Sequence, residues 1–129
     1  MPWDADAPNL GFTSGTPWLP LGPAHAALAV SAQDGDPNSA LAYTRKLAAA
    51  RRAHPALRHG SLELLPGPML AFVRRAGEEA IVCVFNLTQA PAAMELPGPA
   101  TPMDLGTGDA SLSGPVLTLS GHGSFFGLL

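Results

Sequence analysis

Residues 80–87 read Ala-Ile-Val-Cys-Val-Phe-Asn-Leu, a segment that is almost continuously apolar. A strand that is buried on both faces lacks the usual alternation of apolar and polar residues, so this segment predicts a central strand over 80–88. Residues 69–75 predict a second strand, and the short glycine-containing connection between the two strands indicates a β-hairpin. Within the central strand, Cys83 is expected to be a small buried residue and not a nucleophile.

Shorter strands are predicted on both sides of this hairpin. Turn residues recur at intervals of about 8–12 residues, which is typical of a small β-sandwich or barrel. We therefore expect residues 61–129 to form a small antiparallel β-structure. The additional strand segments are residues 62–65, 92–96, 101–105, 116–120 and 124–129.

One helix is predicted over residues 36–53. Asp36 suits the N-cap, and Pro37 suits the first helical position, where no amide donor is needed. The helix is expected to end at His54, because the residue before Pro55 avoids the helical region. Its narrow apolar face is made of alanine and leucine, and such small side chains favour close docking on a larger body or self-association.

The first 35 residues contain five prolines, which prevent a long helix. The same stretch carries three large aromatic side chains, Trp3, Phe12 and Trp18. Long irregular segments are uncommon in compact domains unless they are functional or disordered. This stretch is therefore either an ordered loop that packs on another body or a flexible tail.

The chain has 129 residues, which allows one domain or two very small ones. Only 13% of the residues are charged and the net charge is -3, which argues against a nucleic-acid-binding protein. A single cysteine excludes an internal disulfide bond, and no apolar run is long enough to span a membrane. No signal peptide is apparent in these residues, so a cytoplasmic location is the expectation.

Residue spacing alone reveals no active site. The acidic residues are sparse and lie in turn or cap contexts, and the Glu78-Glu79 pair is expected to be solvated at the hairpin tip. His54 and His59 flank a proline-containing loop, but no carboxylate or cysteine lies at ligand spacing from them. Neither a metal ion nor a cofactor is predicted.

Several segments, taken in order along the whole chain, resemble one family of enzymes. They are similar to the alpha-amylase family of glycoside hydrolases, and in particular to its α-glucosidase, oligo-1,6-glucosidase and trehalose synthase branch. The segments 36–39 and 51–57 resemble the start and the exit of the last barrel helix of that family, and 84–87 resembles a strand of its C-terminal β-domain. The matching loop segments are 1–4 (Met-Pro-Trp-Asp), 9–13 (Asn-Leu-Gly-Phe-Thr) and 18–20 (Trp-Leu-Pro).

The resemblance implies a mixed fold that is dominated by β-structure. Residues 1–60 would be the last loop and helix of a (β/α)8 catalytic barrel, and residues 61–129 a small antiparallel β-sandwich. Active sites of such barrels are built from the loops at one end of the barrel. Trp3, Asp4 and Phe12 are therefore candidates for the rim of a glucose-binding pocket, unless they only anchor the loop on the barrel.

The resemblance assigns no catalytic role to any residue of this chain, and three further residues are expected to be structural. Asp36, Pro37 and Asn86 are expected to be structural. The catalytic carboxylates of the family lie on earlier barrel strands and have no matching position here, so no catalytic residue is carried over. The implied partners are the missing barrel of the same enzyme and an oligosaccharide at the loop rim.

The resemblance thus implies a C-terminal fragment of an α-glucosidase-type hydrolase, which acts on α-glucosidic bonds of oligosaccharides and is inactive alone. The alternative is a stand-alone β-sandwich module that binds carbohydrate or another protein. Starch-binding sandwiches usually display exposed aromatic rings, whereas residues 61–129 contain neither tryptophan nor tyrosine. This composition counts against the carbohydrate-binding alternative.

Overall fold

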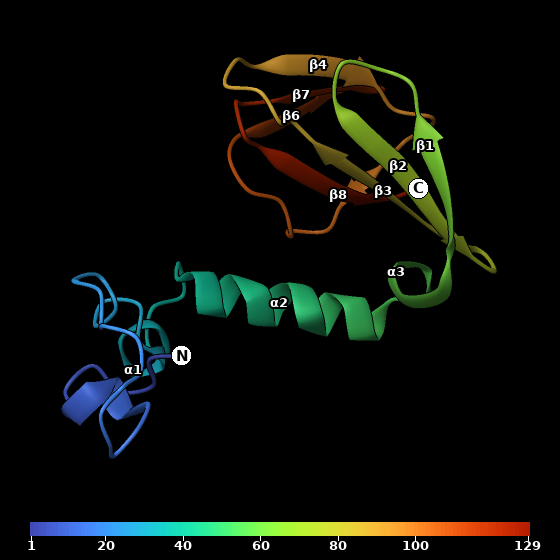
Figure 1. The fold of residues 1–129 in the computed structure, drawn as a ribbon. Helices are drawn as coiled ribbons and strands as arrows, with labels where there is room; N and C mark the ends of the chain where they lie inside the picture. The colour runs from blue at the N-terminus through green and yellow to red at the C-terminus, as the bar shows by residue number, and fades with distance from the viewer. The chain divides into compact units, whose positions relative to one another are not determined.

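The computed structural model describes residues 1–129, which form two compact units (Figure 1). The first unit is Met1–Ala49 and the second is Ala50–Leu129, so the division falls inside helix α2 (Ala40–Ala53). The boundary predicted from the sequence, after residue 60, lies beyond the end of that helix. No helix is long and apolar enough to cross a membrane.

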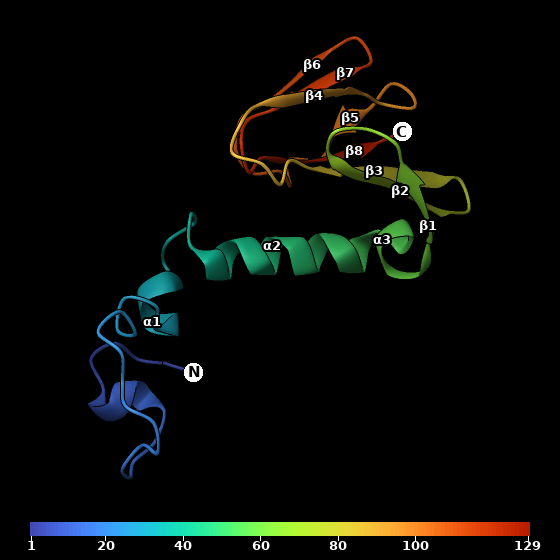
Figure 2. The same ribbon diagram turned by 45° about the horizontal axis from the view of Figure 1, so that its top comes forward.

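The second unit is an antiparallel β-sandwich, which confirms the predicted fold class. Its five-stranded sheet has the order β1-β2-β3-β8-β5, and its three-stranded sheet has the order β4-β7-β6. Figure 2 shows the smaller sheet as a separate layer over the larger one. The strands are β1 (Ser61–Leu65), β2 (Leu70–Ala76), β3 (Glu79–Phe85), β4 (Ala92–Glu95), β5 (Thr101–Pro102), β6 (Ala110–Ser113), β7 (Val116–Leu119) and β8 (Ser124–Leu128).

Strand β3 occupies the centre of the larger sheet and is buried on both faces, as the sequence predicts. Val82 and Val84 belong to the core between the two sheets, where they join residues of β7 such as Leu117. Ile81 and Cys83 point to the other face, in a cluster that includes Ala56. Burial raises the pKa of the Cys83 thiol to about 11, which makes this residue a small core side chain and not a nucleophile.

The β2–β3 hairpin follows its predicted turn chemistry. Ala76 pairs with Glu79, so the loop consists of Gly77 and Glu78. The backbone φ of Gly77 is 59°, a value that the mirror-image turns of tight hairpins require and that glycine adopts without strain. Gly77 therefore permits the tight two-residue loop of this hairpin.

The structure corrects two predictions in the second unit. A short helix, α3 (Pro55–His59), follows α2 where the sequence was expected to continue as a loop, because Pro55 breaks α2 but also suits the first turn of a new helix. Strand β5 covers only Thr101–Pro102, since the backbone of Asp104 turns to a φ of 50° and leaves the extended region. Strand β6, which was not predicted, is a largely exposed edge strand without a run of large apolar residues.

The first unit is mostly irregular, as predicted, and contains the 3-10 turn η1 (Pro8–Gly11) and the short helix α1 (Val30–Gln33). Its only buried residues are Ala29 and Ser39. Most of its large apolar side chains are exposed, namely those of Met1, Trp3, Phe12, Trp18, Leu19, Leu21 and Leu28. This unit therefore has almost no apolar core of its own.

Helix α2 begins at Ala40, so the prediction that Asp36 and Pro37 start the helix is wrong. Asp36 accepts a hydrogen bond from the amide of Asn38 at 2.8 Å, in the turn that precedes the helix. The N-cap is Ser39, whose hydroxyl accepts from the amide of Ala42 at 3.1 Å.

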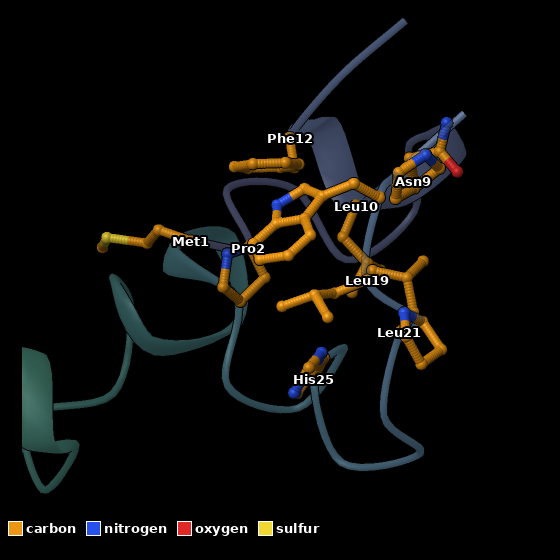
Figure 3. Close-up of a pocket in the computed structure, with 11 residues that line it drawn as sticks. Met1, Pro2, Asn9, Leu10, Phe12, Leu19, Leu21 and His25 are labelled. Atoms are coloured by element: carbon orange, nitrogen blue, oxygen red, sulfur yellow. The ribbon is translucent and has the colours of Figure 1, made fainter. Parts of the chain in front are cut away.

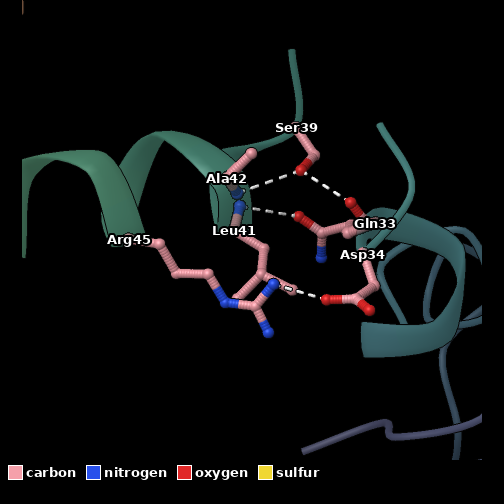
Figure 4. Close-up of polar contacts among 6 residues, drawn as sticks. All are labelled: Gln33, Asp34, Ser39, Leu41, Ala42 and Arg45. Atoms are coloured by element: carbon pink, nitrogen blue, oxygen red, sulfur yellow. Dashed lines mark hydrogen bonds and ion pairs between the residues drawn. The ribbon is translucent and has the colours of Figure 1, made fainter. Parts of the chain in front are cut away.

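A second side chain completes the capping of α2 (Figure 4). The side-chain oxygen of Gln33 accepts a hydrogen bond from the amide of Leu41 at 3.1 Å, and the Ser39 hydroxyl donates to the carbonyl of Gln33 at 2.9 Å. Asp34 forms an ion pair with Arg45, but both side chains are exposed, so this pair adds little to stability. Two neutral side chains, those of Gln33 and Ser39, thus cap the helix three residues beyond the position where the aspartate was expected to cap it.

Candidate functional site

The predicted rim residue Trp3 has a fixed backbone and a free side chain. Its amide donates to the carbonyl of Leu10 at 2.8 Å, and its own carbonyl accepts from the amide of Ser31 at 2.9 Å. The amide of Asp4 donates to the same Leu10 carbonyl at 3.1 Å. The Trp3 side chain nevertheless stays 54% exposed, so the loop displays an indole whose backbone is fixed by hydrogen bonds.

Asp4, the second rim candidate, is engaged in a local turn. Its carboxylate accepts a hydrogen bond from the amide of Asp6 at 3.0 Å. A carboxylate that bonds to the backbone amide two residues further along forms a local turn, and this turn requires no ligand. The structure therefore gives Asp4 a structural partner and leaves its role toward a sugar as a prediction.

The turn that receives these hydrogen bonds has an unusual backbone. Asn9, Leu10 and Gly11 have φ values of 52°, 54° and 68°, the left-handed region that non-glycine residues rarely adopt. Each of the two non-glycine residues costs roughly 1–2 kcal/mol in this conformation. The side-chain amide of Asn9 offsets part of this cost, because it donates to the carbonyls of Thr13 at 3.2 Å and Gly15 at 2.9 Å.

A pocket of about 170 Å³ lies against this turn. Figure 3 shows Phe12 and His25 at opposite ends of the pocket, with Leu10 and Leu19 between them. Phe12, the third rim candidate, lines the pocket, whereas Trp3 and Asp4 do not. The lining residues are Met1, Pro2, Asn9, Leu10, Phe12, Pro17, Trp18, Leu19, Pro20, Leu21 and His25.

Two lining residues that sequence reasoning did not select give this pocket its chemistry. The indole of Trp18 is 85% exposed, the highest value among the exposed large apolar side chains. The Nδ1 atom of His25 accepts a hydrogen bond from the amide of Gly22 at 3.1 Å, so the proton of the neutral ring lies on Nε2. The only signal in the sequence was the Trp18-Leu19-Pro20 motif, and nothing in the sequence marks His25.

A second polar cluster lies in the β-sandwich unit, around Glu79. The carboxylate contacts Nδ1 of His54 at 2.7 Å and accepts from the amide of Ala56 at 2.7 Å. These two partners, the amide first, lower the pKa of Glu79. The expectation that Glu79 is a solvated turn residue is therefore wrong, because it joins the start of α3 to the β2–β3 hairpin.

Asn86, predicted to be structural, is almost fully buried, with 2% of its surface exposed. Its side-chain amide donates to the carbonyls of Ala90 at 2.8 Å and Ser120 at 2.9 Å. Its side-chain oxygen accepts from the amide and the hydroxyl of Thr88 at 3.1 Å and 2.8 Å. Asn86 thus joins the loop after β3 to the loop before β8.

Five of the ten acidic residues form local hydrogen bonds or ion pairs. Asp4, Asp36 and Glu79 accept hydrogen bonds from backbone amides, and two further acids pair with arginines. The lowered pKa of Glu79 is the opposite of what a general acid needs. No group of three or more histidine, cysteine, aspartate or glutamate side chains is placed to hold a metal ion.

Comparisons with known proteins agree on one family. Residues 1–60 match the family described as "Alpha amylase, catalytic domain". A "Probable alpha-glucosidase" of Rhizobium meliloti is 42% identical over 99 residues, which cover 75% of this chain and 18% of that protein. The "Oligo-1,6-glucosidase" of Parageobacillus thermoglucosidasius is 34% identical over 100 residues, again 75% of this chain and 18% of that protein.

A solved structure extends the similarity to nearly every residue. The crystal structure of an alpha-glucosyl transfer enzyme, XgtA, superposes with a TM-score of 0.87 and 39% sequence identity. It covers 99% of this chain, which in turn covers 24% of that protein. The chain therefore spans about a fifth to a quarter of the length of these proteins. By sequence and by structure, the chain belongs to the alpha-amylase family of glycoside hydrolases.

Proposed function

We propose that this chain forms one part of an α-glucosidase-type enzyme that acts on α-glucosidic bonds of oligosaccharides. The observation that carries the proposal is its 42% identity to a protein named "Probable alpha-glucosidase". The match of residues 1–60 to the catalytic domain supports a position of the first unit in the catalytic barrel. The β-sandwich would then support that barrel.

The exposed side chains of the first unit support a barrel as the main partner. A unit that buries only Ala29 and Ser39 leaves its large apolar side chains in water. Burying such side chains stabilises a protein by about 1.5–3 kcal/mol each. The remaining elements of a catalytic barrel are the cover that this unit needs, and a second copy of the chain is the alternative cover.

We also propose that the chain does not hydrolyse glycosides by itself. Retaining and inverting glycosidases both need a pair of carboxyl groups, about 5–5.5 Å or 6.5–9.5 Å apart, on either side of the scissile bond. Five of the ten carboxylates accept hydrogen bonds from backbone amides or pair with arginines. Trp3, Asp4 and Phe12 would contribute to the rim of the pocket and not to bond cleavage.

A stand-alone carbohydrate-binding sandwich is the second reading, and the aromatic residues of the sheet disfavour it. Phe72, Phe85 and Phe126 are half-buried, and their rings pack on one another with centroid distances of 6.0 Å and 5.6 Å. Rings that contact each other at such distances form a cluster and do not offer a free flat face to a sugar.

The proposed inactivity is tested by incubating the purified chain with a chromogenic α-glucoside. We expect no turnover above that of buffer. Turnover that disappears when any one acidic residue is replaced by its amide would show that the chain carries its own catalytic group, and it would overturn the proposed division of labour.

A further inference from the structure

We propose that strand β6 is a docking site for an extended peptide segment of a partner protein, in which basic and apolar residues alternate. The segment would add to the open edge of the three-stranded sheet as a fourth strand. This inference goes beyond the proposed function and does not depend on it, because it concerns the β-sandwich alone and no step of glycoside hydrolysis.

Strand β6 is the edge strand that lacks the usual protection against pairing. Edge strands normally carry charged residues or proline, or are very short, because their unpaired backbone groups are a template for another chain. The other edge strands follow this rule. Strand β1 carries Glu63, β4 carries Glu95, and β5 has only two residues, of which the second is Pro102. Strand β6 reads Ala-Ser-Leu-Ser, with neither a charge nor a proline.

The backbone groups at this edge follow from the register of β6 with β7. The amide of Ser120 donates to the carbonyl of Asp109 at 2.9 Å, immediately before β6. In an antiparallel ladder every second residue bonds to the neighbouring strand, and Ala110 and Leu112 occupy the other positions. Their N–H and C=O groups therefore point away from β7, and each of these two residues offers an added strand one donor and one acceptor.

Two pockets flank β6. The inner pocket, of about 280 Å³, lies between β6 and β8, and its lining includes Leu112 and Phe125. The outer pocket, of about 290 Å³, lies on the exposed face of the small sheet, and its lining includes Ser111 and Asp109. Successive side chains of a strand point to opposite faces, so those of an added strand would alternate between the two pockets. Peptide recognition by strand addition uses this arrangement, in which backbone hydrogen bonds supply affinity and pockets for alternate side chains supply specificity.

The linings of the pockets select the residues of the peptide. Leu112, Phe125 and Phe126 in the inner pocket suit a branched apolar side chain such as that of valine. In the outer pocket the exposed carboxylate of Asp109 forms no ion pair and suits a lysine or arginine side chain. No lysine or arginine follows Arg75 in the chain, so no nearby cation of the sandwich strands competes for this carboxylate.

The other two occupants fit this edge less well. A second copy of the chain would bring an identical β6, which has no basic side chain to meet Asp109. The catalytic barrel is joined to the sandwich through α3, which contributes Ala56 to the cluster of Ile81 and Cys83. That cluster lies on the face of the larger sheet turned away from the smaller sheet, so α3 and β6 lie on opposite sides of the sandwich.

The test is an NMR titration of the full chain with the probe peptide acetyl-Lys-Val-Lys-Val-Lys-amide. We expect the amide signals of Ala110 and Leu112 to shift and to saturate, and their exchange with solvent to slow, because both amides gain a hydrogen-bond partner. The amide signals of Ala93 and Glu95 on β4 should stay unchanged, since β4 is the opposite edge of the same sheet.

Altered probes separate strand addition from charge attraction. N-methylation of alternate amides of the probe should abolish binding for one set of amides and preserve it for the other, because only one set faces β6. The probe acetyl-Glu-Val-Glu-Val-Glu-amide should bind at least about tenfold more weakly, because its carboxylates face that of Asp109.

Variants of the chain test the same contacts from the other side. Ala110→Pro removes one outward donor and no bond to β7, so it should weaken binding about three- to tenfold, as expected for one hydrogen bond. Asp109→Asn should weaken binding of the lysine probe but not of the glutamate probe. Glu95→Gln is the matched control, because it neutralises an exposed carboxylate on the opposite edge, and it should leave binding unchanged.

Four results would overturn the proposal. The first is a titration in which no signal saturates, and the second is equal binding of the two methylated probes or of the lysine and glutamate probes. The third is a shift of the Ala110 and Leu112 signals with protein concentration alone, which would make a second copy the occupant. The fourth is loss of probe binding when the chain is part of a complete enzyme, which would show that the barrel covers β6.

Discussion

The buried amide of Asn86 offers the sharpest test of how the β-sandwich is held together. Asn86→Ala removes two donated and two accepted hydrogen bonds between the loops at one end of the larger sheet. A typical hydrogen bond contributes about 1 kcal/mol net, which gives about 4 kcal/mol for the set. Thr88 and Ala90 lie at the surface and can bond to water in the variant, so we expect a loss of about 2–3 kcal/mol.

Asn86→Asp adds a pH dependence with a definite sign. The introduced carboxyl group keeps an acceptor toward Thr88 but faces the carbonyl oxygens of Ala90 and Ser120. Burial and these oxygens favour its protonated form, so its pKa is raised in the folded state. Stability is then retained below the unfolded pKa, about 3.9, and is lost as the pH rises through the raised folded value. The variant should be less destabilised in acid than at neutral pH.

The assay is urea unfolding with two probes that report on different units. Trp3, Trp18 and Tyr43 all lie in Met1–Ala49, so fluorescence follows the first unit only. Far-UV circular dichroism includes the signal of the strands, all of which lie in the second unit, together with that of helix α2. We expect Asn86→Ala to shift the dichroism transition and to leave the fluorescence transition in place.

Gln89→Ala is the matched control for this experiment. Gln89 carries the same amide group three residues further along but is exposed, so its loss should change the free energy of unfolding by less than about 0.5 kcal/mol. Two results would refute the reasoning. One is an Asn86→Ala variant as stable as Gln89→Ala, and the other is an Asn86→Asp variant whose stability relative to wild type improves with rising pH.

Three further predictions concern other contacts. Glu79→Gln should lower stability by about 1–2 kcal/mol at pH 7, and the difference should shrink below pH 4.5. The pKa of Glu79 is lower in the folded than in the unfolded state, so the ionised carboxylate stabilises the fold above the unfolded pKa, and this stabilisation is lost as the pH falls through the folded pKa. Unfolding measured at both pH values checks this. Ser39→Ala should cost about 1 kcal/mol and speed amide exchange in the first turn of α2, and Asp36→Ala should cost less than half as much. Gly121→Ala, whose methyl group would lie 2.0 Å from a backbone carbonyl oxygen, should cost at least about 2 kcal/mol by thermal unfolding, while Gly98→Ala, with open space around it, should leave the melting temperature nearly unchanged.

The parts of the fold that the sequence predicts are those whose signals are local. The apolar run around Ile81 and Val84 identifies the central strand, because only a strand covered on both faces lacks polar positions. Gly77 identifies the hairpin, because the turn needs its positive φ. These features depend on a few neighbouring residues, so they can be recognised without knowledge of the tertiary structure.

The features that were missed depend on distant residues. Glu79 looks like a turn residue until His54, 25 positions earlier, is brought beside it. The start of α2 is set by Ser39 together with Gln33, whose side chain reaches the amide of Leu41 from the preceding helix. A local cap preference at Asp36 carries no information about that second contact.

The candidate site shows the same division between local and distant signals. Phe12 could be singled out because it belongs to a motif of the family, and the structure places it in the pocket wall. Trp18 also belongs to a motif of the family, but its place beside His25 in the pocket lining depends on how the proline-rich loop lies against the turn around Leu10. Such loop geometry has no periodic pattern in the sequence.

The most direct test of the central claim is a chimera. This chain would replace the matching segment of the Parageobacillus thermoglucosidasius oligo-1,6-glucosidase, and hydrolysis of a chromogenic α-glucoside would be compared with that of the intact enzyme and of the same enzyme without the segment. We predict that the chimera regains activity that the deletion lacks. The chain would supply the loop, the helix and the sandwich, and the rest of the enzyme would supply the catalytic carboxylates. A folded chimera as inactive as the deletion would contradict the account.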